Sequence, residues 1–132
     1  MGTFDDIAAR TGWGIPGEAD THRSAEEIAE LIQLSRSADG RIRKIAVANL
    51  CPCHVRSDYP PVWDRVLEMI HDPDPLVRRT VVHMLADGSP RGRQAQVLEA
   101  LDALRNDPDR KVRRQVHHVL GEQRRTGRVN VL

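Results

Sequence analysis

The residues with the clearest chemical potential in this sequence are two cysteines and a histidine that fall within four positions. Cys51, Cys53 and His54 belong to residues 50–61, which read LCPCHVRSDYPP, and they bring two thiols and an imidazole together. Sulfur and imidazole ligands of this kind suit Zn²⁺ or Cu(I). One hypothesis for this chain is therefore a metal- or redox-responsive protein that uses this loop.

The spacing of these residues is not that of a usual zinc site. Structural zinc sites prefer C-x-x-C and a second pair of ligands, for which His22, His83 and Asp58 are the distant candidates. A disulfide within C-x-C would close a strained ring. The alternative is that Pro52 ends a helix and that Cys51 is a small buried side chain, kept reduced in a reducing compartment. We favour this interpretation and expect no bound cofactor.

No other pattern in the sequence favours catalysis. It contains no Gly-rich phosphate loop, no G-x-S-x-G and no H-E-x-x-H, and helix capping explains its Asp-Pro pairs. A chain of 132 residues is also small for an enzyme with a closed pocket. We therefore expect a protein that is not an enzyme.

A 35-residue period organises most of the chain. The stretch DPDPLVRRTVVHML at residues 72–85 returns as DPDRKVRRQVHHVL at 107–120, and a weaker copy, SADGRIRKIAVANL, occupies 37–50. Equal spacing of similar segments is the signature of a structural repeat. Each copy opens with a turn whose Ser or Asp suits a helix N-cap and whose Pro or Gly interrupts the preceding helix. The period therefore predicts a helix after each turn.

Two amphipathic helices are predicted in every repeat. Within each copy, apolar positions recur at i, i+4, i+7 and i+8, and a second apolar set lies upstream of each turn. Ser24 with Glu27 forms a capping box, and Pro60 with Pro61 suits a first helical turn. The stripes are Ile42, Ala46, Asn49 and Leu50; Val77, Val81, Met84 and Leu85; and Val112, Val116, Val119 and Leu120, and the upstream sets are Ile28, Leu31 and Leu34; Trp63, Val66 and Met69; and Leu98, Leu101 and Leu104.

The repeated D-x-D-x-x-V-R pattern, which runs from Asp72 to Arg78 and from Asp107 to Arg113, resembles the second helix of HEAT repeats. Over residues 24–125 the chain is similar to the short bacterial HEAT-like type, and its CPC and DGSP loops are similar to those of small bacterial HEAT-repeat proteins. The resemblance implies an all-α, right-handed α-solenoid of about three helix pairs, at residues 24–50, 60–85 and 95–125. It implies no activity.

The resemblance also implies a ladder of polar contacts between neighbouring repeats. In the family, the aspartate of the turn and the arginine after the valine typically bond across the repeat boundary. We expect these residues to be structural: Asp39, Arg43, Asp74, Arg78, Asp109 and Arg113.

The two ends of such an array need covering, because a terminal repeat exposes one apolar face. Residues 1–23 predict a short N-terminal capping helix and linker, and residues 126–132 predict a tail in which Val129, Val131 and Leu132 follow Gly127. The first 36 residues carry 3 basic and 7 acidic residues. An alternative role for this acidic segment is to lie along a basic surface and compete with a partner. For the tail, the alternative is a docking peptide or a dimer contact.

Composition agrees with a thin helical array. Aromatic residues make up only 3% of the chain and charged residues 30%, a balance typical of stacked helices with much surface. No stretch approaches the roughly 18 apolar residues of a membrane span, and the first residues lack the basic and apolar regions of a signal peptide. These patterns predict a cytoplasmic protein without membrane contact.

A row of basic side chains is predicted on the second helix of each repeat, opposite the apolar stripe. In HEAT-type arrays the second helices line the concave surface, so this basic strip suits an acidic protein partner. The alternative is a solvated face that merely keeps the protein soluble. The strip consists of Arg41, Lys44, Arg79, His83, Lys111, Arg114 and His118.

Nucleic acid is the second candidate ligand for this strip, because a positive concave surface can follow a phosphate backbone, as in HEAT-like DNA glycosylases. Those enzymes use longer arrays with aromatic and acidic residues around an extruded base, whereas none of the four aromatic residues here falls on the strip. Some chromophore lyases of phycobiliproteins also contain HEAT-like repeats, which suggests a lyase by analogy of fold alone. We therefore expect an interaction scaffold first, nucleic-acid binding second and a metal or redox role third.

Overall fold

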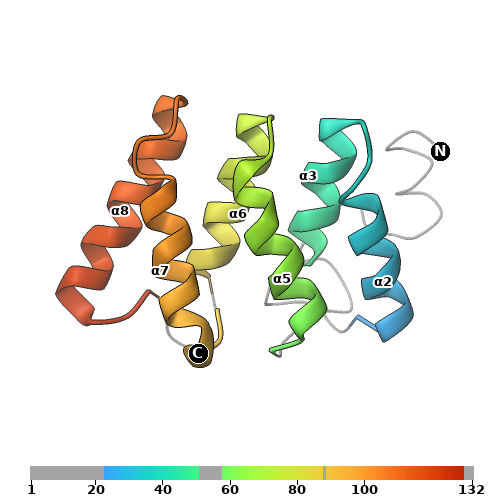
Figure 1. Cartoon of the computed structure of the whole chain (residues 1–132), viewed down its shortest axis with the longest axis horizontal. Helices are drawn as coiled ribbons and strands as arrows, with labels where there is room; N and C mark the ends of the chain where they lie inside the picture. Colours follow the sequence, from blue (N-terminus) through green and yellow to red (C-terminus); the bar gives the residue numbers. More distant parts are fainter. Residues whose placement is uncertain (1–22, 51–57, 88, 130–132) are drawn as a thin grey trace.

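The computed structural model describes residues 23–50, 58–87 and 89–129 of the chain, and within these ranges it is helical without any strand. The helices form consecutive pairs that stack side by side along the long axis of the molecule (Figure 1). This arrangement confirms the predicted all-α array of helix pairs. The pairs are α2 (Ala25–Leu34) with α3 (Gly40–Asn49), α5 (Pro60–Glu68) with α6 (Pro75–Ala86), and α7 (Gln94–Ala103) with α8 (Arg110–Thr126). A short 3-10 helix, η1 (Met69–His71), lies between α5 and α6, and another, η2 (Arg91–Arg93), lies between α6 and α7.

The turns start the helices as their sequences predict. Asp39, Asp74 and Asp109 are the N-caps of α3, α6 and α8, and each carboxylate accepts a hydrogen bond from the backbone N–H two residues later, at 2.9, 2.9 and 3.1 Å. Ser24 and Glu27 close the capping box of α2. These bonds satisfy backbone donors that the first helical turn leaves without a partner.

The core is a continuous aliphatic layer between the two rows of helices. All the side chains of the predicted stripes on α3, α6 and α8 are buried, and so are the upstream sets except Leu98, which is only partly buried and packs against the core. Among the described residues, Trp63 is the largest fully buried side chain. The 3.6-residue period therefore identified the buried faces of the helices correctly.

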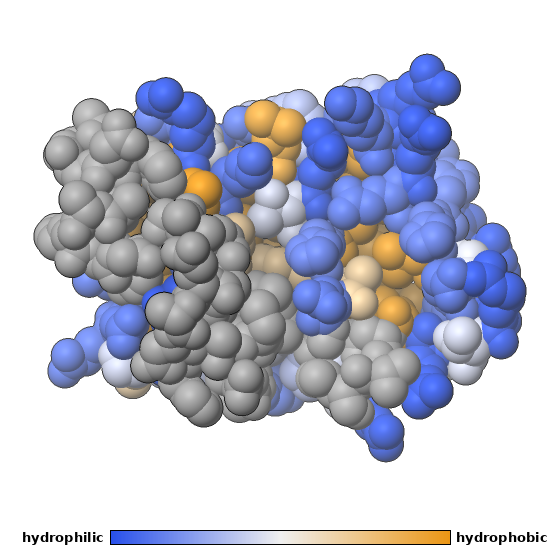
Figure 2. Space-filling view, turned by 180° about the vertical axis from the view of Figure 1, so that it is seen from behind, coloured by the Kyte–Doolittle hydropathy of each residue, from blue (hydrophilic) through white to orange (hydrophobic). Residues whose placement is uncertain are grey.

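The two rows of helices differ in how closely their members approach. The second helices pack along one another, α3 against α6 and α6 against α8, whereas α2 and α5 touch at few points. Gly40 allows part of this approach, since a Cβ at this position would lie 2.5 Å from Asp74 Oδ2. The stack is therefore tighter on the side of the second helices. The view opposite to that of Figure 1 shows hydrophilic side chains with hydrophobic atoms exposed between them (Figure 2).

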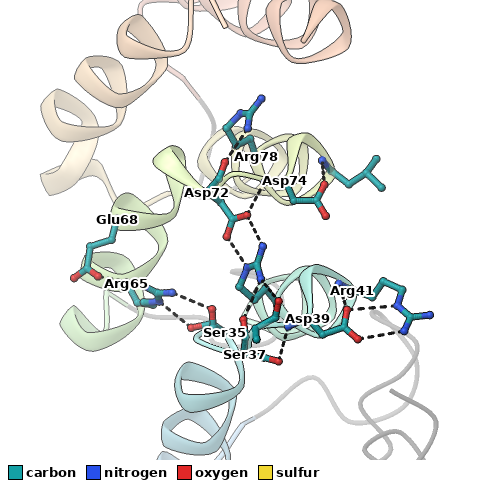
Figure 3. Close-up of polar contacts among 12 residues, drawn as sticks. Ser35, Ser37, Asp39, Arg41, Arg65, Glu68, Asp72, Asp74 and Arg78 are labelled. Carbon is teal, nitrogen blue, oxygen red and sulfur yellow. Dashed lines mark hydrogen bonds and ion pairs between the residues drawn. The ribbon is translucent and has the colours of Figure 1, made fainter. Parts of the chain in front are cut away.

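Two arginines join neighbouring repeats through buried, bidentate ion pairs. Arg43 of α3 donates from Nε and Nη2 to the carboxylate of Asp72, at 2.8 and 3.0 Å. Arg78 of α6 repeats this contact with Asp107, at 2.8 and 2.9 Å. Figure 3 shows Asp72 between the start of α6 and the turn that precedes α3, where its carboxylate accepts the two bonds from Arg43. Two parallel N–H···O bonds fix the relative orientation of the repeats as well as their separation.

The prediction that Asp39, Asp74 and Asp109 form this ladder is wrong. The first aspartate of each D-x-D motif reaches back to the preceding repeat, while the second is engaged as the N-cap of its own helix. Asp72 and Asp107 also accept a hydrogen bond from the backbone N–H two residues later, which orients their carboxylates. In the first repeat Ser37 takes over this local bond, at 3.1 Å to the N–H of Asp39, without a carboxylate.

Arg113 keeps the local backbone bond of Arg78 but has no carboxylate across from it in residues 23–50, 58–87 and 89–129. Its Nη1 donates to the backbone oxygens of Asp107 and Pro108, at 2.7 and 3.0 Å. His117 also makes this helix more polar than its counterparts. It is exposed, whereas Val47 and Val82 at the equivalent positions of the earlier repeats are completely buried. The outer side of α8 is therefore a polar end of the described array.

Other arginines connect the row of first helices, which touch only sparsely. Arg65 of α5 donates to the hydroxyl and the backbone oxygen of Ser35, at 2.8 and 2.9 Å. Arg93 donates to Asp58 at 2.7 Å and to Asp64 at 3.3 Å, and the hydrogen bond with Asp58 raises the pKa of Arg93. These contacts link the repeats where few apolar side chains meet.

The predicted ends of the array are only partly within the described residues. Helix α8 stops at Thr126, and Gly127 follows it in the left-handed conformation with φ of 78°, as expected of a C-terminal glycine. Val129 is buried in the core, while Val131, Leu132 and the predicted capping helix in residues 1–23, except Arg23, lie outside the described residues. Among the described helices, none is both long and apolar enough to cross a membrane.

The inter-repeat ion pair should contribute more to stability than the local bonds of the same arginine. Arg78→Gln leaves Asp107 buried without its charge partner and should lower the free energy of unfolding by about 3 kcal/mol. Arg113→Gln removes the equivalent local bonds but no cross-repeat pair, so its effect should stay below about 1 kcal/mol. Urea unfolding followed by circular dichroism measures both values, and equal losses would contradict the role given to the pair.

Stability should also fall in acid through Asp107. Burial raises the pKa of this carboxyl, but the hydrogen bond from Arg78, the N–H of Asp109 and the nearby positive charges outweigh it, so the net pKa is lowered. A folded pKa below the unfolded value of about 3.9 means that ionised Asp107 stabilises the fold above that pH, and that this contribution disappears as the pH falls through the folded pKa. Urea midpoints of the natural chain and of Asp107→Asn should therefore differ at pH 7 and converge below about pH 4. A constant difference would argue against this.

Candidate functional site

The seven residues of the predicted basic strip lie on the three second helices, and the structure brings four of them around one groove. Lys44 enters it from α3, Arg79 and His83 from α6, and Lys111 from α8. The cavity measures about 350 Å³ and opens to solvent. Arg41, Arg114 and His118 are on the same helices but do not line the groove.

Three further residues line this groove and were absent from the strip predicted by charge. They are Leu76, Thr80 and Gln115. The repeat alignment held a signal for the first of them, because Leu76 stands at the position of Arg41 and Lys111 in the other repeats and so interrupts a basic column. Thr80 and Gln115 stand at the position of Ile45 and carry no comparable signal.

Two polar residues of the groove are engaged in hydrogen bonds to the helix backbones. The hydroxyl of Thr80 donates to the backbone oxygen of Leu76 at 3.0 Å. Gln115 Nε2 of α8 donates to the backbone oxygen of Arg79 at 3.2 Å, which ties α8 to α6.

The cations of the groove differ from the arginines that join the repeats in forming no ion pair. Within the described residues, no ion pair involves Lys44, Arg79 or Lys111. Arg41, by contrast, lies 3.2 Å from Asp39, and its hydrogen bond lowers the pKa of that carboxyl, so much of its charge is compensated locally. The groove therefore gathers from three repeats cations that form no ion pair within the described residues.

His83 is placed at the edge of this group. Its Nε2 lies 3.7 Å from Asp87 Oδ2, and both side chains are exposed. The acidic neighbour sits at the end of α6, whereas Leu76 and Arg79 sit in its first half. The negative charge of Asp87 is thus confined to one end of the groove.

The predicted metal ligands Cys51, Cys53 and His54 lie outside the described residues, as does His22. Of the two distant candidates that are described, Asp58 accepts a hydrogen bond from Arg93 at 2.7 Å, and His83 lines the groove. Within the described ranges, no three His, Cys, Asp or Glu side chains form a group suited to a metal ion.

Comparison with known protein families gives a match to HEAT repeats over residues 28–121. Comparisons with curated proteins and with solved structures give no significant match. The matched region contains α3, α5, α6 and α7 in full and most of α2 and α8. HEAT repeats generally act as scaffolds for protein interactions and are typically not enzymes. Because the match spans most of its length and its helix pairs stack as such repeats do, the chain belongs to the HEAT-repeat family.

Proposed function

We propose that this protein is a non-enzymatic interaction module that binds an acidic protein partner on the face formed by α3, α6 and α8. The observation that carries the proposal is the groove between these helices, where Lys44, Arg79 and Lys111 converge and form no ion pair in the described residues. Each cation comes from a different repeat, so the stacking of the repeats is what assembles the site.

The convergence of these charges favours binding over a purely solvated surface. Like charges held around one hollow repel one another, and the field they create attracts a ligand of opposite sign. The arginines that join the repeats, Arg43, Arg78 and Arg93, are by contrast paired with aspartates. An acidic partner would supply the missing compensation and would be steered to this face.

A protein partner suits this face better than a single-stranded nucleic acid does. Sequence-tolerant binding of single strands relies on aromatic side chains on which bases stack. The described aromatic residues are Trp63, which is buried, and Tyr59, which is partly buried against the core, and both lie at the first helix of the second repeat. The groove offers charge and one aliphatic side chain, and these features suit a carboxylate-rich protein surface.

Reversing the groove charges should abolish capture of the partner. The variant Lys44→Glu, Arg79→Glu, Lys111→Glu tests the site, and the control Arg36→Glu, Arg91→Glu, Arg105→Glu changes the net charge equally at arginines outside α3, α6 and α8. Each protein is immobilised in nuclease-treated native lysate, and captured proteins are quantified by mass spectrometry. We expect an acidic protein bound by the natural chain and the control, and a loss of at least about tenfold in the groove variant, or about 1.4 kcal/mol. Circular dichroism and thermal unfolding verify that all three are folded.

Equal capture by all three proteins would overturn the proposal. Loss of the partner by the control variant as well as by the groove variant would overturn it too. Nucleic acid is tested in parallel with a synthetic duplex of about 20 base pairs. If the proposal holds, duplex binding at physiological salt stays in the non-specific range, with a Kd weaker than about 10⁻⁶ M. Tighter duplex binding that depends on the groove cations and falls steeply with salt would make nucleic acid the ligand instead.

A further inference from the structure

Leu76 is the only large hydrophobic side chain that is markedly exposed within the described residues, with 46% of its surface accessible. It lies in the first turn of α6 and lines the groove. Its backbone N–H donates to the carboxylate of Asp74, the N-cap of α6, and any residue except proline would make this bond equally well. Neither the cap nor the core therefore explains a leucine at this position.

The equivalent positions in the neighbouring repeats are occupied by basic residues. Arg41 stands there in the first repeat and Lys111 in the third, and both are exposed. A scattered apolar residue on a surface needs no special explanation. Leu76, however, lines a hollow together with Lys44, Arg79 and Lys111, and both features limit which ligands would fit there.

The cations are arranged around Leu76 on several sides. Lys44 reaches the groove from α3, Lys111 reaches it from α8, and Arg79 follows Leu76 on α6. An apolar contact in the middle of basic groups complements a ligand with an apolar group between acidic ones. A uniformly acidic tail or a phosphate backbone would leave Leu76 without a matching contact.

The size of the groove limits how much of a partner can enter it. Its volume of about 350 Å³ lies at the lower end of the range for ligand pockets, which suits a few side chains and not the surface of a whole domain. Anchoring one apolar side chain in a small hollow, with charges around the rim, is a common way for a short peptide segment to bind.

We infer that the groove recognises a short acidic segment of the partner, which places one apolar side chain on Leu76 and its flanking carboxylates near Lys44 and Lys111. This inference rests on the proposed function, because it assumes that the same face receives an acidic protein. It adds a sequence requirement to the charge requirement: an aliphatic or aromatic residue with Asp or Glu on both sides.

The inference is tested with five-residue peptides, acetylated and amidated, in which two glutamates flank each side of a central Leu, Phe, Ser or Gly. Titration into ¹⁵N-labelled full-length protein, followed by NMR, gives a Kd for each peptide and shows which backbone N–H groups respond. The Leu and Phe peptides should bind about fivefold or more tightly than the Ser and Gly peptides, which corresponds to about 1 kcal/mol. The responding residues should lie on α3, α6 and α8 around the groove.

Two variants at one position isolate the apolar contact from the charges. In Leu76→Ser the preference for Leu and Phe should fall below about twofold while the Gly peptide keeps its Kd. In Leu76→Met the preference should persist, because the apolar surface is retained. Both changes are at an exposed site, so thermal unfolding should differ little from that of the natural chain.

Equal affinities for all four peptides, or a preference that survives Leu76→Ser, would overturn the inference and leave the charge-based proposal intact. The inference alone also fails if no peptide binds while the groove variant still loses its partner in lysate, since the ligand is then a folded surface. If the synthetic duplex displaces the peptides and binds Leu76→Ser with the same affinity as the natural chain, both the inference and the proposed function fail.

Discussion

The bidentate pairing of an arginine with the first aspartate of the following repeat is the contact on which the arrangement of the second helices depends. Arg43 with Asp72 and Arg78 with Asp107 join consecutive repeats at equivalent positions of the repeat. Apolar packing alone would let two helix pairs slide or rotate, because aliphatic contacts carry little directional preference. A guanidinium that meets a carboxylate with two parallel bonds defines one orientation, and desolvation of both groups makes a misplaced alternative costly.

This fixed arrangement also determines what the surface can do. Since α3, α6 and α8 are held close together, side chains from three repeats converge on one hollow, although they are separated by roughly one repeat length in the sequence. The arginines of the ladder and the cations of the groove belong to the same helices but differ in their contacts. The former are paired with aspartates, and the latter line an open groove and form no ion pair in the described residues. Adjacent arginines such as Arg78 and Arg79 thus make different contacts, Arg78 with Asp107 and Arg79 at the groove.

The sequence predicted the helix pairs and their buried faces well, since the 35-residue period and the apolar stripe both arise from local geometry. It did not show which aspartate of D-x-D crosses the boundary, because both residues are suitable acceptors and only their orientation in the turn separates them. A clue was nevertheless present: the first repeat keeps Asp39 but has Ser37 at the position of Asp72, where no preceding arginine among the described residues requires a carboxylate. The groove was predicted in part. The charge pattern identified four of its lining residues and missed Leu76, Thr80 and Gln115, which carry no charge.

The central claim is that the hollow between the second helices is where a partner segment lies, and a photo-crosslinking amino acid at Thr80 tests it most directly. Thr80 lines the groove without contributing charge, so its replacement leaves the proposed contacts in place. The control carries the same crosslinker at Gln96, an exposed position on α7. After irradiation in native lysate, the account predicts one dominant crosslinked peptide for the Thr80 protein, rich in Asp and Glu with an apolar residue among them, and none of it for the control. Identical crosslinks from both positions, or crosslinks to nucleic acid from Thr80, would contradict the account.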